Sequence, residues 1–415
     1  MNGTVIMSLN KLYSNKLLIV LGFIYLNSLH YFDYVNYDPT YGGWVTKTIV
    51  ICLFMFIFIK KVKVKQPNET WKYALGFVTL PMLSFISCYF EHEQSILSSI
   101  WAYFPLFILP FTFLILYKYN VSTEDVVKLL TIFAVVRTGI LLIEQFTYPQ
   151  YLFAFRPEIE LENGYIQPIE IRSGIYRFYI SDTYLSMFLI FYWGAKMIDK
   201  FKLNYFLLFA WGVFGLWLDQ TRQFMVVGYA SFLIIVLLSK SKRRIFIFLS
   251  ILIVFLVVFL NFDRFFGDLI EKTTTEVNSE NIRLFSYNMY FNEYWGGVLS
   301  IIFGNGLPAP GSSYAQEITN MTQVMHLYRS DVGIVGFLNQ YGIVSVVYFL
   351  WFYISYVRRN WKYFDMYIKM FLVATFLNLP LVVLFVNNYN WYMYWGFMLY
   401  LMSQSIKQNF RRRVF

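Results

Sequence analysis

The sequence predicts an all-α polytopic integral membrane protein with about 12 transmembrane helices in a single membrane domain, residues 1–415. Hydrophobic residues make up 58% of the chain, charged residues make up 14%, and the mean hydropathy is +0.51. A soluble domain carries about 25% charged residues. Apolar runs of roughly 20 residues recur along the whole chain, and short basic loops alternate with more acidic, aromatic ones.

The apolar runs define the expected spans in order, from the first run near the N-terminus to the last before the basic tail. We expect spans at 16–32, 46–60, 73–90, 96–117, 126–146, 182–198, 203–218, 223–239, 244–262, 333–357, 364–386 and 390–406.

The basic loops predict how these spans are oriented. Lys60, Lys240, Arg358 and the tail at Arg411 all belong to short basic segments on the same side of the alternation. By the positive-inside rule this side faces the cytoplasm, together with both chain ends. The first span has no small-residue cleavage site after it and is expected to be retained. The net charge of +10 therefore reflects anchoring to the inner face of the lipid bilayer, and no nucleic acid is an expected partner.

Three segments on the outward side are long enough to build a site: 33–45, 147–181 and 263–332. The last is the expected main catalytic loop, because ordered loops of this size usually serve a function. Its first half, 263–297, has helical spacing of apolar residues. Its second half, 304–323, is rich in Gly, Pro, Ser and Asn and is expected to be irregular.

The outward segments, counted with the few cations inside spans, hold 3 Lys and 8 Arg, whereas the inward side holds 16 Lys and 7 Arg. Lys is a point charge, whereas Arg is a planar fork that can grip a phosphate group in two places. The positive-inside rule accounts for the inward lysines and leaves the outward arginines unexplained. The pattern therefore predicts a phosphate-bearing substrate on the outer face.

Two outward turns carry candidate anion ligands. Arg222 lies in a tight hairpin that begins at Asp219, at the depth of a lipid head group; its alternative role is to snorkel at the interface. Arg172 and Arg177 flank Gly174 just before the sixth span, where they could hold a pyrophosphate. Their alternative is a solvated loop that nearby glutamates neutralise.

The fifth span contains two ionisable residues on one helix face, Arg137 and Glu144, which are two helical turns apart. Ionisable groups at membrane depth are costly and are usually functional or paired. Both readings stay open here: a contact to the substrate phosphate, or an ion pair with another span.

Candidate catalytic residues surround the end of the last outward segment. Arg283 lies on its helical half, and His326, Arg329 and Asp331 lie just before the tenth span. An imidazole can deprotonate a sugar hydroxyl, and Asp331 is the alternative base or the N-cap of the following helix. His92, in contrast, lies in a short turn between spans.

The sequence contains no metal-ligand cluster, P-loop, nucleotide fingerprint or Asp-x-Asp pair. Its two cysteines, Cys52 and Cys88, both lie in apolar spans and have no metal-binding spacing. We therefore expect neither a metal nor another cofactor.

Over roughly residues 125–350 the chain resembles the O-antigen polymerase and O-antigen ligase superfamily of bacterial envelopes. The first pieces of the resemblance are Leu141–Phe146 at a span end, Arg172-Ser173-Gly174, and Thr221-Arg222-Gln223, where Gln223 replaces a small residue. The last piece is the series Arg283, Gly304-Asn305-Gly306, His326, Ser330-Asp331-Val332-Gly333 and Gln340-Tyr341-Gly342.

The resemblance implies a glycosyltransferase of the bacterial inner membrane with a fold like that of the GT-C enzymes. Its donor would be an undecaprenyl-pyrophosphate-linked oligosaccharide, and its site would face the periplasm without a metal. A polymerase passes the glycan to the non-reducing-end sugar of another lipid-linked unit; a ligase, the alternative, passes it to lipid A–core. The sequence after Ser330, and Leu327 directly after His326, favour the polymerase.

The resemblance also implies roles and partners. The pyrophosphate ligands would be Arg137, Arg172, Arg177, Arg222, Arg283 and Arg329, and the catalytic residues would be Arg283 and His326 or Asp331. A chain-length regulator and a flippase of the same pathway are possible partners. The main rival class is a lipid-linked oligosaccharide flippase, which often has two similar halves, but no internal repeat is visible. A structural scaffold is the third class.

Overall fold

The computed structural model describes residues 21–22, 51–53, 55, 69–150, 152–153, 171–172, 175–176, 178, 182–239, 282–380 and 389–414. These residues form helices, apart from one short antiparallel pair, β1 (Ile171–Arg172) and β2 (Ile175–Tyr176). Four helices are long and apolar enough to cross a membrane: Thr70–Glu91, Ile96–Lys118, Thr123–Thr147 and Arg329–Tyr363. Three shorter apolar helices accompany them. The chain is therefore a helical, multi-pass membrane protein.

Most ends of the described helices coincide with those of the expected spans to within a few residues. The last helix continues to Val414, beyond the expected end at 406, and the end expected at 386 lies outside the described residues. The described helices are α3 (Thr70–Thr79), α4 (Phe85–Glu91), α5 (Ile96–Tyr103), α6 (Ile108–Lys118), α7 (Thr123–Thr147), α8 (Thr183–Asp199), α9 (Leu203–Asp219), α10 (Arg222–Leu238), α16 (Gly333–Trp351), α18 (Met366–Asn378) and α19 (Tyr389–Val414). The spans expected at 16–32, 46–60 and 244–262, and the loop 33–45, lie wholly or almost wholly outside the described residues. The total of about 12 spans therefore stays a prediction.

Two of the spans are interrupted near their middle by proline. The 3₁₀ turn η1 (Pro81–Ser84) separates α3 from α4, and η2 (Phe104–Phe107), which contains Pro105, separates α5 from α6. Proline has no backbone N–H and its ring clashes with the preceding turn, so the α-helix cannot continue unchanged. The span of α16 is interrupted at Gly342 and continues as η6 (Phe352–Val357), α17 (Arg358–Asn360) and η7 (Trp361–Tyr363).

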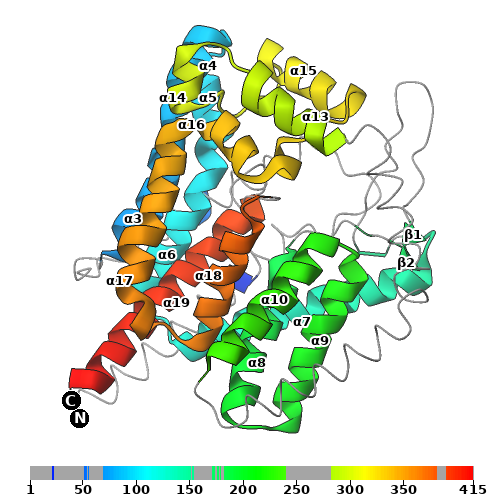
Figure 1. Ribbon diagram of the computed structural model, residues 1–415, viewed down its shortest axis with the longest axis vertical. Coiled ribbons are helices and arrows are strands. Elements are labelled where there is room, and N and C mark those ends of the chain that lie inside the picture. The colour runs from blue at the N-terminus through cyan, green and yellow to red at the C-terminus, as the bar shows by residue number, and fades with distance from the viewer. Residues whose placement is uncertain are drawn as a thin grey trace.

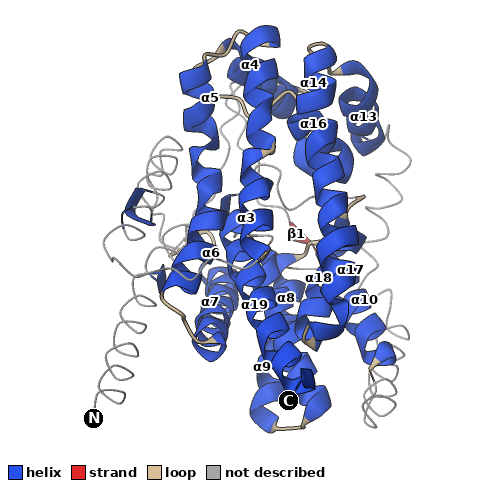
Figure 2. Cartoon of the chain, turned by 90° about the vertical axis from the view of Figure 1, so that its left-hand side faces the viewer, coloured by secondary structure: helices blue, strands red, loops and turns tan. Residues whose placement is uncertain are grey.

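The helices pack in two neighbouring groups (Figures 1 and 2). In one group α7, α8 and α9 pack on one another, and α10 and α18 pack against α8; in the other, α6 contacts α3 and α19, and α16 contacts α3. The fully buried ring of Trp395 on α19 packs against Phe371 at 5.0 Å and Phe77 at 5.9 Å between ring centroids. Aromatic side chains therefore fill much of the interior.

We name the two ends of the helices by the turns that they carry. The proximal side holds the turns 119–122, 200–202 and 358–365 and the C-terminal end of α19. The distal side holds the turns 92–95 and 219–222 and the segment 282–332, of which α4, α5, α13, α14 and α15 lie at the top of Figure 1.

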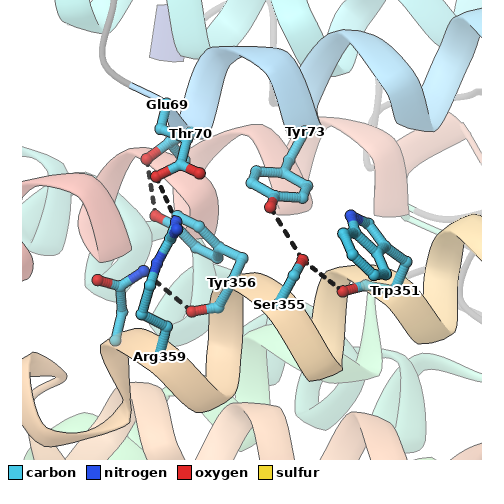
Figure 3. Close-up of polar contacts among 8 residues, drawn as sticks. Glu69, Thr70, Tyr73, Trp351, Ser355, Tyr356 and Arg359 are labelled. Carbon is cyan, nitrogen blue, oxygen red and sulfur yellow. Dashed lines mark hydrogen bonds and ion pairs between the residues drawn. The ribbon is translucent and has the colours of Figure 1, made fainter.

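Polar contacts join α3 to the end of the tenth span on the proximal side (Figure 3). The hydroxyls of Thr70 and Tyr356 lie 2.7 Å apart, in a buried contact, and those of Tyr73 and Ser355 lie 3.0 Å apart. Glu69 and Arg359 form an exposed ion pair beside them. Because exposed pairs add little stability, the buried hydroxyl contact does more to fix how these helices align.

The segment 282–332 is mostly helical. It comprises α13 (Ile282–Asn288), η3 (Met289–Glu293), α14 (Val298–Phe303), α15 (Ser313–Thr319), η4 (Asn320–Val324) and η5 (Arg329–Val332). The helical expectation for its first half is confirmed for residues 282–293 and is wrong for 294–297, which are not helical. Residues 304–312 are irregular as expected. The expectation of an irregular chain is wrong for 313–323, because Ser312 accepts a hydrogen bond from the Ala315 N–H and starts a helix.

Candidate functional site on the distal side

The fold places every described lysine on the proximal side, together with Arg358, Arg359 and the arginines at the end of α19, whereas the arginines named below lie on or toward the distal side. Every lysine of the described residues lies near the proximal turns: Lys72, Lys118, Lys128, Lys196, Lys200, Lys202, Lys362, Lys369 and Lys407. Arg222, Arg283 and Arg329 lie on the distal side, and Arg137 lies in the distal half of α7. The separation seen along the sequence is therefore a property of the folded molecule.

Arg137 is fully buried and forms a two-point ion pair with Asp219, the last residue of α9. Its Nη2 lies 2.5 Å from one carboxylate oxygen and its Nη1 lies 3.0 Å from the other. Nη1 also donates to the Ser186 hydroxyl on α8 at 3.1 Å. The side chain thus joins α7, α8 and α9, and a substrate phosphate would have to displace Asp219 to reach it. Of the two readings left open by the sequence, the structure forms the ion pair.

Two residues at the end of α7 anchor the following segment. Glu144 is fully buried, and its Oε1 accepts the N–H groups of Leu152 at 3.1 Å and Phe153 at 2.7 Å. The Gln145 side chain accepts the N–H of Tyr176 and donates to its carbonyl. This holds the β1–β2 pair, in which Arg172 lies opposite Ile175. The Arg172 side chain, and Arg177 as a whole, lie outside the described residues.

Arg222 is half-buried at the first position of α10 and follows Gln220, whose φ of 51° makes the hairpin tight. Two residues further on, the Phe224 ring packs edge-on against Tyr184, with centroids 5.3 Å apart. The Tyr184 hydroxyl in turn accepts a hydrogen bond from Asn378, the last residue of α18, at 3.1 Å. The helix of Arg222 therefore meets the distal end of α18.

Arg283 is exposed on the first turn of α13. On the same helix, the Tyr287 hydroxyl donates to the carbonyl of Pro380, which follows α18. α13 also packs against η5, which carries Asp331. The helices of Arg222 and Arg283, far apart in sequence, thus each lie against the same end of α18.

Arg329 is enclosed by three tyrosines, Tyr290, Tyr294 and Tyr314, which we call the tyrosine cage. Its guanidinium carbon lies 5.4–5.8 Å from the three ring centroids, and the residue is 3% exposed. It donates to the Tyr314 hydroxyl at 2.9 Å and to the Gly306 carbonyl at 3.3 Å. Burial raises the pKa of each phenol, so the rings stay neutral and attract the cation. A pyrophosphate could reach Arg329 only if this cage opened.

His326 and Asp331 are both exposed on the distal side. His326 has a φ of 56° and lies between η4 and η5. Asp331 accepts a hydrogen bond from the Ser330 hydroxyl at 3.3 Å. Val332 occupies the N-cap position of α16, without a side-chain cap bond. The capping role considered for Asp331 is therefore wrong, while its role as a base stays a prediction.

Sequence reasoning passed over His92, which the structure holds in a defined orientation. Its Nε2 lies 2.9 Å from Asn305 Oδ1, and its ring stacks on Tyr314 at 4.2 Å. The Asn305 amide donates to the Tyr294 carbonyl, which directs Oδ1 toward His92 and places the imidazole proton on Nε2. Burial, reinforced by Arg329, lowers the pKa of His92. No local signal could reveal this contact, because Asn305 lies 213 positions further along the chain.

Two pieces of the family-like pattern contact each other through their backbones. The N–H of Asn305 donates to the Asn339 carbonyl and that of Gly306 to the Gln340 carbonyl, both at 2.8 Å. Gly304 has a φ of +88° and Gly342 a φ of +75°. A Cβ on Gly304 would overlap the backbone of the segment 339–342, and a Cβ on Gly342 would overlap the backbone of the segment 302–304. These glycines therefore allow close packing.

Within the described part of the chain, no three His, Cys, Asp or Glu side chains are grouped as metal ligands. A comparison with protein-family models and one with curated proteins found no match. The residues and their arrangement are therefore the basis for a function.

Proposed function

We propose that the protein is a metal-independent glycosyltransferase of the bacterial cytoplasmic membrane that polymerises a polysaccharide on its outer face. The donor is a glycan on undecaprenyl pyrophosphate, and the acceptor is a sugar hydroxyl of a second lipid-linked repeat unit. The observation that carries the proposal is the gathering of lysines on the proximal side with Arg222 and Arg283 on the distal side. Under the positive-inside rule, the proximal side faces the cytoplasm.

The arginines would act on the leaving group. A guanidinium fork binds phosphate oxygens in two places and stabilises charge that develops as the sugar–phosphate bond breaks. Arg222 and Arg283 suit this role because both of their helices lie against the distal end of α18. Arg172 and Arg177, whose side chains lie outside the described residues, are further candidates. The bonding electrons pass to the diphosphate, while the acceptor oxygen bonds to the anomeric carbon.

The base would be His326 or Asp331, which accepts the proton of the acceptor hydroxyl. Both side chains are exposed on the distal side, and η5, which carries Asp331, packs against the helix of Arg283. An exposed base can be reached by a large glycan acceptor.

The test is reconstitution of the purified protein with lipid-linked repeat units and no lipid A–core. Wild-type protein is expected to give a ladder of products, and Arg222→Ala and Arg283→Ala are expected to lower the rate by about 100-fold or more each. Arg359→Ala, an exposed arginine on the proximal side, is the matched control and should keep the wild-type rate. A normal ladder from both distal variants, at normal membrane levels, would contradict the proposal.

The same assay separates the rival functions. Products that form only when lipid A–core is added would identify a ligase. Movement of the lipid-linked glycan across the vesicle membrane, without a new glycosidic bond, would identify a flippase.

A further inference from the structure

The chain segment 297–312 runs from the distal side toward the interior of the helix bundle and then returns to the distal side. At its start, the carboxylate of Glu91, at the distal end of α4, accepts the N–H groups of Leu299 at 3.0 Å and Ser300 at 2.9 Å. After α14, the Gly304 carbonyl accepts a hydrogen bond from Ser87. Ser87 lies one helical turn below Glu91, or about 6 Å at 1.5 Å per residue. α14 therefore runs from the distal end of α4 toward the interior.

The return path is fixed by side chains of the neighbouring span. The Leu307 N–H donates to the Tyr103 hydroxyl at 3.0 Å, and the Ala309 N–H donates to Gln94 Oε1 at 2.7 Å. Gln94 lies in the distal turn between α4 and α5, and the Ser312 hydroxyl also donates to it. Irregular backbone within a bilayer needs such internal partners, because the hydrocarbon offers none.

One face of α14 remains open. Val298 is 71% exposed, Ile301 45% and Ile302 37%. These positions are spaced i, i+3 and i+4, so they form a single apolar face. The helix buries its other side against α16 and α4.

The open face of α14 continues an apolar stripe on α16. From Gly333 to Gly342, α16 has no exposed residue, and the stripe begins at Ile343 and continues to Ile354. The Gly342 backbone lies against Ile302 and Gly304. Distal to this contact, α14 therefore takes the place of α16 at the surface of the bundle.

The apolar stripe on α16 is shorter than the hydrocarbon core of a bilayer, and the exposed face of α14 extends it. From Ile343 to Ile354 it covers about 17 Å, whereas the hydrocarbon core of a bilayer is about 30 Å thick. The six residues of α14 add about 9 Å. The neighbouring spans, of 22 and 23 residues, are each about 33 Å long, and the first of them ends at Glu91, beside the start of α14. α14 thus lies within the depth that these two spans cross.

We propose that α14 is embedded in the distal leaflet, with Val298, Ile301 and Ile302 against lipid acyl chains. Part of the segment 263–332, which the sequence assigns to an extramembrane loop, then lies inside the membrane as a re-entrant hairpin. The inference rests on packing and length alone, so it stands whether or not the protein is a glycosyltransferase.

Spin labels on single cysteines test this placement in vesicles of phosphatidylethanolamine and phosphatidylglycerol. The labelled variants are Ile301→Cys on α14, Val347→Cys on the α16 stripe and Ser313→Cys at the exposed start of α15, each with Cys52→Ser; Cys88 is buried and is kept. The label at 301 is expected to be relaxed by oxygen and not by a water-soluble nickel chelate, as at 347. The label at 313 should show the reverse.

Two results would overturn the proposal. Relaxation of the 301 label by the nickel chelate as strongly as the 313 label would place α14 in water. Protection from both reagents would mean that protein, and not lipid, covers it. Val298→Cys offers a second position on the same face if the variant at 301 does not fold.

Discussion

Arg329 and Arg283 have the same guanidinium group, but one is buried and the other is exposed. Arg329 is closed inside the tyrosine cage and bonded to the Gly306 carbonyl, whereas Arg283 is exposed on α13. Sequence reasoning grouped them as ligands of one pyrophosphate, because residue type and sequence position do not reveal burial. The structure suits Arg329 to holding the irregular chain after α14, whereas Arg283 is exposed at the surface of α13.

Replacement of each arginine separates these roles. Arg329→Ala removes two hydrogen bonds and three cation–π contacts from a buried site, so we expect a loss of about 2–4 kcal/mol in the free energy of unfolding. Arg283→Ala should change it by less than about 0.5 kcal/mol, as exposed substitutions do. Thermal unfolding in detergent measures both. Equal losses in the two variants would contradict the assignment.

His92 predicts a pH dependence of stability. Burial lowers the pKa of His92 below its usual value of about 6.5, with Arg329 acting in the same direction and Glu91 and Glu317 against it. The unfolded chain then binds the proton more tightly than the folded one. The stability contribution of neutral His92 is complete above about pH 6.5 and is lost as the pH falls toward the lowered folded pKa.

The variant His92→Gln removes this titration and keeps a donor toward Asn305. We expect the unfolding temperature of the wild type to fall more steeply between pH 7.5 and 5 than that of His92→Gln. The comparison is made between the two proteins because carboxylates titrate in both. Parallel curves would show that His92 is not held neutral by the fold.

At the scale of elements, the glycine junction between residues 304–306 and 339–342 joins α14 to α16. Gly304→Ala and Gly342→Ala each place a methyl group against backbone at a positive φ, so each is expected to destabilise the fold by more than about 1 kcal/mol. Gly139→Ala in α7 is the control, since nothing lies within 4 Å of its added Cβ. It should stabilise by about 0.5–1 kcal/mol. Chemical denaturation of the three variants in one detergent gives the ranking, and an opposite order would refute it.

The same elements show what the sequence could predict. α7 and α9 were placed to within a few residues, because the ends of a long apolar run in the sequence mark the approximate ends of the helix. α15 was missed, because it lies in the stretch 304–323, whose Gly, Pro, Ser and Asn residues are typical of a loop, although Ser312 caps a helix there. α14 was not identified as a separate helix, because Glu91, which accepts the N–H groups of its first turn, lies more than 200 positions earlier. Local patterns identify helices but do not reveal partners that are distant in sequence.

Contacts between residues distant in sequence also limited the prediction of the candidate site. The sequence identified Arg222 and Arg283 as candidates, but the position of both helices at the end of α18 depends on Tyr184, Asn378 and Pro380, which no motif contains. It also left the ion pair of Arg137 open, because the partner carboxylate belongs to another span.

For the whole molecule, the separation of lysines from distal arginines predicts one orientation in the membrane. In intact cells, a membrane-impermeant maleimide should label Ser313→Cys on α15 and leave Gln408→Cys on α19 unlabelled. Permeabilised cells should show labelling at both positions, which controls for reactivity. Labelling of position 408 alone in intact cells would show the opposite orientation and would contradict the proposed activity on the outer face.

The pairing of Arg137 with Asp219 has a consequence for biogenesis. The two residues are 82 positions apart, so α7 leaves the ribosome well before its counterion has been synthesised. A guanidinium in an isolated apolar helix is costly in lipid. The insertion machinery must therefore keep α7 in a polar environment until α9 has been synthesised. The two helices then enter the bilayer together.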